Sequence, residues 1–72
     1  MDKKIFDSAL AYAGTSQRQA AANAGISYKG LNNAVNGGTL KQSTIKDICK
    51  VIGARYEERI IFPDGQTFTS SD

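Results

Sequence analysis

Residues 16–38 read SQRQAAANAGISYKGLNNAVNGG, and this stretch decides the fold. Its first part is rich in alanine, the residue with the highest helix propensity, and predicts a helix over residues 17–24 that ends at Gly25. The hydroxyl of Ser16 can accept a hydrogen bond from the backbone N–H of Gln19, and the Gln19 side chain can return to the N–H of Ser16. Because this helix is only about two turns long, it must pack against other elements to be stable.

A second helix is expected directly after a short turn, over residues 28–36. Ile26 lies in the turn, Ser27 can cap the start of the helix, and a glycine pair follows its end. Leu31 and Ala34 are expected on its inward side. Two helices joined by a turn of about three residues that contains glycine form the helix-turn-helix pattern.

Further helices are expected on both sides of this pair. Upstream, apolar residues recur with the spacing of one helical face over residues 3–13, and Gly14 then ends the helix. Downstream, Thr39 can cap a fourth helix that ends at Gly53. The apolar faces of these two helices consist of Ile5, Phe6, Ala9, Leu10, Ala13, Ile45, Ile48, Cys49 and Ile52.

The sequence changes in character after Gly53. The pattern over residues 56–62 predicts a strand, Pro-Asp-Gly at residues 63–65 is a strong turn signal, and residues 66–69 complete a β-hairpin. A short fifth helix over residues 56–61 is the alternative.

The predicted fold class is therefore mainly α, a compact four-helix helix-turn-helix domain with a C-terminal β-hairpin. A chain of 72 residues has room for one domain, which we expect to span residues 1–69 and to be followed by a frayed tail over residues 70–72.

Composition limits the classes of function. Cys49 is the single cysteine and histidine is absent, which excludes an intrachain disulfide, a Cys/His zinc site and a histidine-dependent triad. We expect no cofactor and no enzyme activity. The net charge of +2 permits a partner with a phosphate backbone without requiring one. Apolar stretches are short, which predicts a cytoplasmic protein without a membrane segment.

The stretch over residues 16–53 resembles the Cro/repressor (Xre-type) helix-turn-helix family. The resemblance covers about half of the chain and includes the fourth helix. Its fixed points are Ser16-Gln17, Ala21, Gly25-Ile26-Ser27, Leu31 and Asn36-Gly37. It implies that the helix over residues 28–36 lies in the major groove of double-stranded operator DNA.

The resemblance also implies roles for outward residues. Lys29 would contact guanine or phosphate, and Asn32 and Asn33 would bind adenine through two hydrogen bonds each. Gln17 and Arg18 would contact the DNA backbone. Tyr28 would contact a thymine methyl group or a phosphate. The candidate binding residues are Gln17, Arg18, Ser27, Tyr28, Lys29, Asn32, Asn33 and Asn36.

Three features depart from the family pattern. Gly30 lies inside the predicted recognition helix, at a cost of roughly 0.5–1 kcal/mol relative to alanine. The same helix contains no arginine, and Val35 stands where the family usually carries a polar residue. The predicted DNA-reading surface is therefore sparse.

A second function follows from another resemblance. The whole chain is similar to the small second regulators encoded beside the repressor in temperate-phage lysis/lysogeny switches, which can act as anti-repressors. This resemblance implies a complex with the partner phage repressor that alters its DNA binding. Val35, Tyr28 and the apolar tail would supply the contact surface, either for the repressor or for a homodimer formed through an edge strand over residues 56–62.

Overall fold

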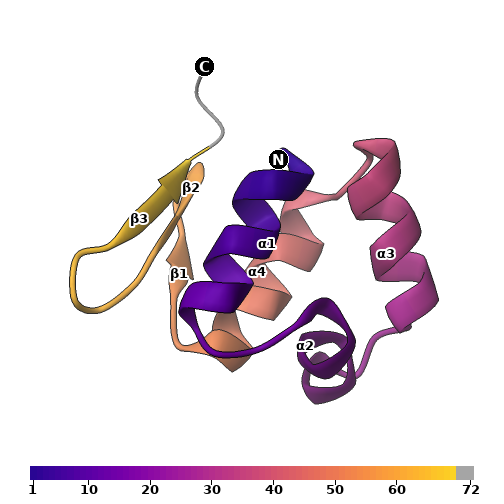
Figure 1. The fold of residues 1–72 in the computed structure, drawn as a ribbon, viewed down its shortest axis with the longest axis horizontal. Coiled ribbons are helices and arrows are strands. Elements are labelled where there is room, and N and C mark those ends of the chain that lie inside the picture. Colours follow the sequence, from indigo (N-terminus) through magenta and orange to yellow (C-terminus); the bar gives the residue numbers. More distant parts are fainter. Residues whose placement is uncertain (70–72) are drawn as a thin grey trace.

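Four helices followed by a small sheet make up the computed structural model, which describes residues 1–69 (Figure 1). The helices are α1 (Lys3–Tyr12), α2 (Gln17–Ala24), α3 (Tyr28–Gly37) and α4 (Gln42–Ile52). The strands are β1 (Arg55–Tyr56), β2 (Arg59–Ile61) and β3 (Thr67–Thr69). The predicted mainly α fold with a C-terminal hairpin is confirmed, and the alternative of a fifth helix is wrong. The predicted frayed tail, residues 70–72, lies outside the described residues.

The start of α2 and the turn to α3 follow the local signals. Ser16 Oγ accepts a hydrogen bond from the Gln19 backbone N–H at 3.2 Å, as predicted. Gly25 ends α2 at φ 73°, a left-handed backbone conformation that residues with a Cβ rarely adopt. The Ile26 N–H then donates to the Ala21 carbonyl at 3.0 Å and closes the turn. These bonds fix how α3 leaves α2.

The start of α4 differs from the prediction. Lys41, and not Thr39, is its N-cap residue, and it forms no side-chain capping bond. Thr39 still belongs to the end of α3, because its N–H donates to the Ala34 carbonyl at 2.9 Å beyond the left-handed Gly38. The extended α3 cap therefore moves the start of α4 downstream.

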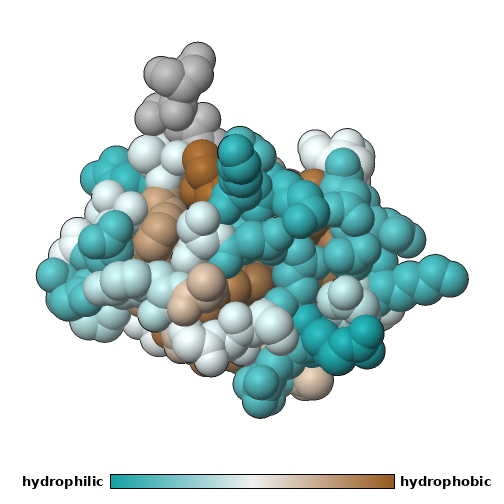
Figure 2. All heavy atoms as spheres, in the orientation of Figure 1, coloured by the Kyte–Doolittle hydropathy of each residue, from teal (hydrophilic) through white to brown (hydrophobic). Residues whose placement is uncertain are grey.

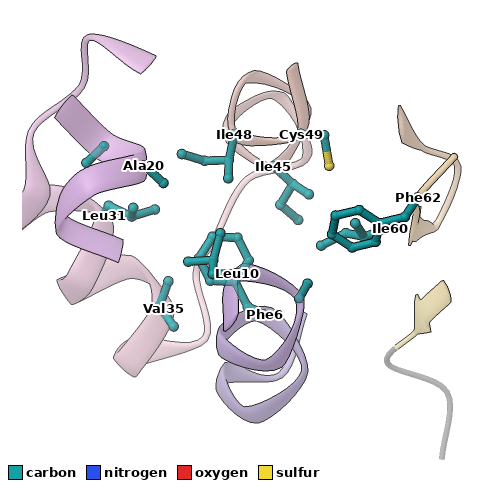
Figure 3. Close-up of a cluster of buried hydrophobic side chains, with 12 residues drawn as sticks. Phe6, Leu10, Ala20, Leu31, Val35, Ile45, Ile48, Cys49, Ile60 and Phe62 are labelled. Atoms are coloured by element: carbon teal, nitrogen blue, oxygen red, sulfur yellow. The ribbon is translucent and has the colours of Figure 1, made fainter. Parts of the chain in front are cut away.

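The core draws side chains from every helix and from the sheet (Figure 3). Val35 corrects the sequence analysis: it was expected on the surface but is only 2% exposed. It lies four residues after Leu31, on the same face of α3, and both side chains point inward. Val35 is therefore unavailable to a partner. The buried residues are Phe6, Ala9, Leu10, Ala20, Ala21, Leu31, Val35, Ile45, Ile48, Cys49, Ile60 and Phe62.

The sheet is antiparallel with strand order β1-β2-β3. The single strand predicted over residues 56–62 is interrupted by a tight turn in which Glu58 has φ 62°. As a result β2 is the central strand, with Ile60 opposite Tyr56 on one side and opposite Phe68 on the other. The prediction of an edge strand is therefore wrong for β2, because β1 and β3 already pair with both of its edges. A homodimer stays a prediction and would need a different contact.

An aromatic cluster joins α1 to the sheet. The ring centroid of Tyr12 lies 4.9 Å from that of Phe62 and 5.7 Å from that of Phe68. The Tyr12 hydroxyl also donates a hydrogen bond to the carboxylate of Asp64 in the β2–β3 turn. Edge-to-face rings of this kind contribute about 0.5–1.5 kcal/mol beyond their burial. The cluster fixes the sheet against the C-terminal end of α1.

Helices α1 and α4 form the middle of the molecule and separate its two sides. In Figure 1, α1 and α4 lie between the sheet on one side and the α2–α3 pair on the other. Figure 3 shows Ile60 and Phe62 entering the core from the sheet side, while Leu31 and Val35 enter from α3. Within residues 1–69, every helix is too short or too polar to cross a lipid bilayer.

Candidate functional site

The outward face of α3 carries most of the predicted binding residues. Lys29, Asn33 and Asn36 are exposed, and Asn32 and Tyr28 are half-buried. The opposite face holds the buried residues of α3, so the polar face is the side that is open to a partner. Figure 2 shows hydrophilic residues over the side of the molecule that α2 and α3 form, and apolar surface nearer the sheet and α1.

Ser27 caps the start of α3, as predicted, and its predicted contact with a partner stays a prediction. Its Oγ accepts a hydrogen bond from the backbone N–H of Gly30 at 3.1 Å and so caps α3. The hydroxyl is exposed and can still donate its own proton to a partner. Its main contribution is to the start of the helix that carries Lys29 and Asn32.

A continuous chain of side-chain hydrogen bonds links three helices, and we call it the amide chain. It consists of Asp7 on α1, Gln17 on α2, and Asn32 and Asn36 on α3. Gln17 Nε2 donates to Asp7 Oδ1 at 2.6 Å, and Asn32 Nδ2 donates to Gln17 Oε1 at 3.1 Å. Asn36 Nδ2 then donates to Asn32 Oδ1 at 3.0 Å. The structure thus brings Gln17, Asn32 and Asn36 together, whereas Asn33 has no part in this chain.

Asp7 was missed by the sequence analysis. The spacing of Lys3 and Asp7 does predict an ion pair on one helix face, and their charged atoms lie 2.8 Å apart. The bond from Gln17 to Asp7, however, depends on how α1 packs against α2, which no local pattern in the sequence encodes.

The charge of Asp7 is stabilised by its neighbours. Partial burial acts to raise its pKa, but hydrogen bonds from Lys3 and Gln17 outweigh that effect, and the pKa is lower than usual. The partner Lys3 has a raised pKa, mainly through its hydrogen bond to Asp7. A carboxylate therefore lies beside Gln17, the residue to which the family resemblance assigns a phosphate contact. That carboxylate repels phosphate.

Arg18 and Tyr28 join the starts of α2 and α3. The Arg18 guanidinium carbon lies 4.4 Å from the centroid of the Tyr28 ring, within the range of a cation–π interaction. This contact leaves the edge of the guanidinium able to donate hydrogen bonds. Arg18 and Lys29 are the cations that α2 and α3 offer to a partner.

Beside this contact, a shallow hollow lies between α1, α2 and α3. Asp7, Gln17, Arg18, Tyr28 and Asn32 are among its lining residues, so the amide chain and the cation–π pair meet there. The hollow gives the site both a carboxylate and a guanidinium within one recess. It can therefore receive a polar group of either charge.

Comparisons of the chain with protein-family models, with curated proteins and with solved structures find no match. Among residues 1–69, no cluster of histidine, cysteine, aspartate or glutamate side chains is arranged to hold a metal ion.

Proposed function

We propose that this protein is a transcriptional regulator and not an enzyme: a helix-turn-helix protein of a phage lysis/lysogeny switch that binds operator DNA in a Cro-like manner in the cytoplasm of a bacterial host. The observation that supports the proposal is the polar face of α3. It presents Lys29, Asn33 and Asn36 to solvent while Leu31 and Val35 hold the helix in the core. A short helix displayed in this way fits the major groove.

Recognition would divide between base edges and phosphates. Asn32 and Asn33 can each pair with adenine through one donated and one accepted hydrogen bond, and Lys29 can donate to guanine. Arg18 can reach a phosphate. If Arg18, Lys29 and two or three further lysines or arginines contact phosphates, we expect a salt dependence of roughly −3 to −5 in log K against log salt for each monomer, from about −0.9 for each neutralised phosphate.

The alternative function is an anti-repressor that binds the partner phage repressor and alters its DNA binding. A specific observation favours it: Asp7 places a carboxylate next to Gln17, where a DNA-binding relative would approach a phosphate. Lys29 is the single cation on α3. Both features suit a protein surface better than a polyanion, because charge complementarity governs such contacts.

A mobility-shift titration separates the two functions. The probe is double-stranded DNA from the region that flanks the gene, and it is mixed with this protein, with the adjacent-gene repressor, and with both, at several salt concentrations. A sequence-specific shift by the protein alone that the repressor leaves unchanged would reject the anti-repressor. No shift alone, together with a changed repressor shift in the mixture, would reject direct DNA binding.

A variant of α3 tests whether this helix carries the function. Replacing Lys29, Asn32 and Asn33 with alanine should abolish the shift or the effect on the repressor. The matched control removes one cation and two polar side chains from the exposed face of α4, and it should retain activity. The control substitutions are Gln42→Ala, Ser43→Ala and Lys50→Ala. Equal activity of the two triple variants would contradict the proposal.

A further inference from the structure

Both ends of the Asn32 side-chain amide are occupied inside the protein. Its Nδ2 donates to Gln17 Oε1 at 3.1 Å, and its Oδ1 accepts from Asn36 Nδ2 at 3.0 Å. An amide has two N–H donors and an oxygen with two lone pairs. Asn32 therefore keeps one donor and one acceptor for a partner, in a fixed order. Adenine presents one acceptor, N7, and one donor, N6–H₂, in the major groove.

Asp7 fixes that order from the other end of the amide chain. An ionised carboxylate only accepts hydrogen bonds, whereas an amide can present either its oxygen or its nitrogen. Gln17 must therefore turn its Nε2 toward Asp7, which leaves its Oε1 facing α3. Asn32 must in turn face Gln17 with its Nδ2. The carboxylate of Asp7 therefore sets the direction of donor and acceptor along the whole amide chain.

We propose that Asp7 is a positioning residue, which sets the donor and acceptor order of the Asn32 amide through Gln17 and thereby the preference for A·T over G·C at the base pair that Asn32 meets. The inference rests on the proposed DNA-binding function and adds a specificity determinant to it. Asp7 itself touches no base. Without the carboxylate, Gln17 and Asn32 can both rotate by half a turn, and the order of the free donor and acceptor is lost.

Asp7→Asn is the variant that tests this inference. Asparagine has the same shape and can still accept from Gln17, but it can also donate, so it no longer imposes a polarity. Two matched controls separate other effects. Asp47→Asn makes the same change of net charge on the exposed face of α4, and Lys3→Ala removes the ion pair while it leaves the Asp7 carboxylate in place.

The first measurement is NMR of the free protein, in which the side-chain N–H₂ signals of Gln17 and Asn32 are followed as the pH is lowered. The other charged or titratable groups around Asp7 are Lys3, Arg18 and Tyr28 on one side and Asp2 and Lys4 on the other. Asp7→Asn keeps all of them, so an Asn32 titration that survives in this variant does not come from Asp7. We expect the Asn32 signals to move with the Asp7 carboxyl signal in the wild type and in Asp47→Asn, and to lose this titration in Asp7→Asn. The inference would be overturned if the chemical shifts of the Asn32 side-chain N–H₂ group changed neither when Asp7 is protonated nor when it is replaced.

The second measurement is sequence selectivity. A duplex is selected from a random double-stranded DNA pool on the wild-type protein, and each A·T pair is then replaced by G·C. We expect one position to lose its discrimination in Asn32→Ala, and Asp7→Asn to lose roughly tenfold there, the scale of one bidentate base contact. Asp47→Asn and Lys3→Ala should keep that discrimination. Affinity for random DNA should rise more in Asp7→Asn than in Asp47→Asn, because the Asp7 carboxylate lies beside the predicted phosphate contact at Gln17.

The outcomes keep the inference apart from the proposed function. Full discrimination by Asp7→Asn at the Asn32 position would overturn the inference and leave the DNA-binding function standing. A wild-type protein that selects no sequence would overturn the DNA-binding function and the specificity claim together, and the NMR titration would still decide whether Asp7 orients Asn32. Loss of discrimination in Lys3→Ala as large as in Asp7→Asn would also count against the inference, since it would assign the effect to the ion pair.

Discussion

Gly30 lies in α3 although nothing in the structure requires a glycine there. A Cβ added at this position would meet only the Ser27 side chain, at an ordinary van der Waals distance of 3.7 Å. Gly30→Ala should therefore raise the free energy of unfolding by roughly 0.5–1 kcal/mol, because alanine loses less backbone entropy on folding. Urea unfolding measures the change. Gly25→Ala is the matched control and should lower the free energy of unfolding, since Gly25 has φ 73°. A higher free energy of unfolding in both variants would contradict the argument.

Asp7 should also contribute to stability in a pH-dependent way. Its pKa is lowered in the folded protein, so its contribution is present above the unfolded pKa of about 3.9 and is lost as the pH falls through the folded pKa. Because the Lys3–Asp7 pair is exposed, we expect Asp7→Asn to cost less than about 1 kcal/mol at pH 7. Unfolding free energies of the two proteins should converge toward pH 2. A constant difference across this range would contradict the assigned role of the charge.

Among the elements, the helices were predictable because their signals are local. Serine caps, the alanine run and the glycine stops at Gly25 and Gly53 depend only on neighbouring residues. The β1–β2 turn was not predictable, because Glu58 adopts a positive φ that glycine or asparagine normally supplies. Burial of Val35 and the bond from Gln17 to Asp7 depend on packing between helices, which sequence spacing does not define.

The packing of α2 is the most sensitive part of the helical framework. Ala21 is fully buried in the core, and its carbonyl accepts the bond that closes the turn to α3. Ala21→Leu should lower the unfolding free energy by about 1–3 kcal/mol or more, because the core has no room for a larger side chain. Thermal melting measures the loss. Ala22→Leu makes the same change at an exposed position of the same helix and should have little effect; equal melting temperatures for the two variants would show that α2 is packed differently.

For the molecule as a whole, Cys49 reports on global opening. Its side chain is 2% exposed, and burial raises the pKa of its thiol to about 11, so the reactive thiolate is scarce at neutral pH. We expect alkylation by iodoacetamide at pH 8 to require unfolding, and to become faster in Ala21→Leu. Ser43→Cys in a Cys49→Ala background places a thiol on the exposed face of α4 and should react at the rate of a free thiol. Equally fast reaction of native Cys49 would contradict its place in the core.

The position of α1 between the sheet and the α2–α3 pair has a consequence for how the chain folds as it is made. The ribosome releases α1 first, but two side chains of the core that it joins are released much later, Ile60 from β2 and Phe62 directly after it. Until then the buried face of α1 stays partly exposed to water. The nascent chain would therefore present the polar face of α3 before the packing of α1, the helix that carries Asp7, is complete.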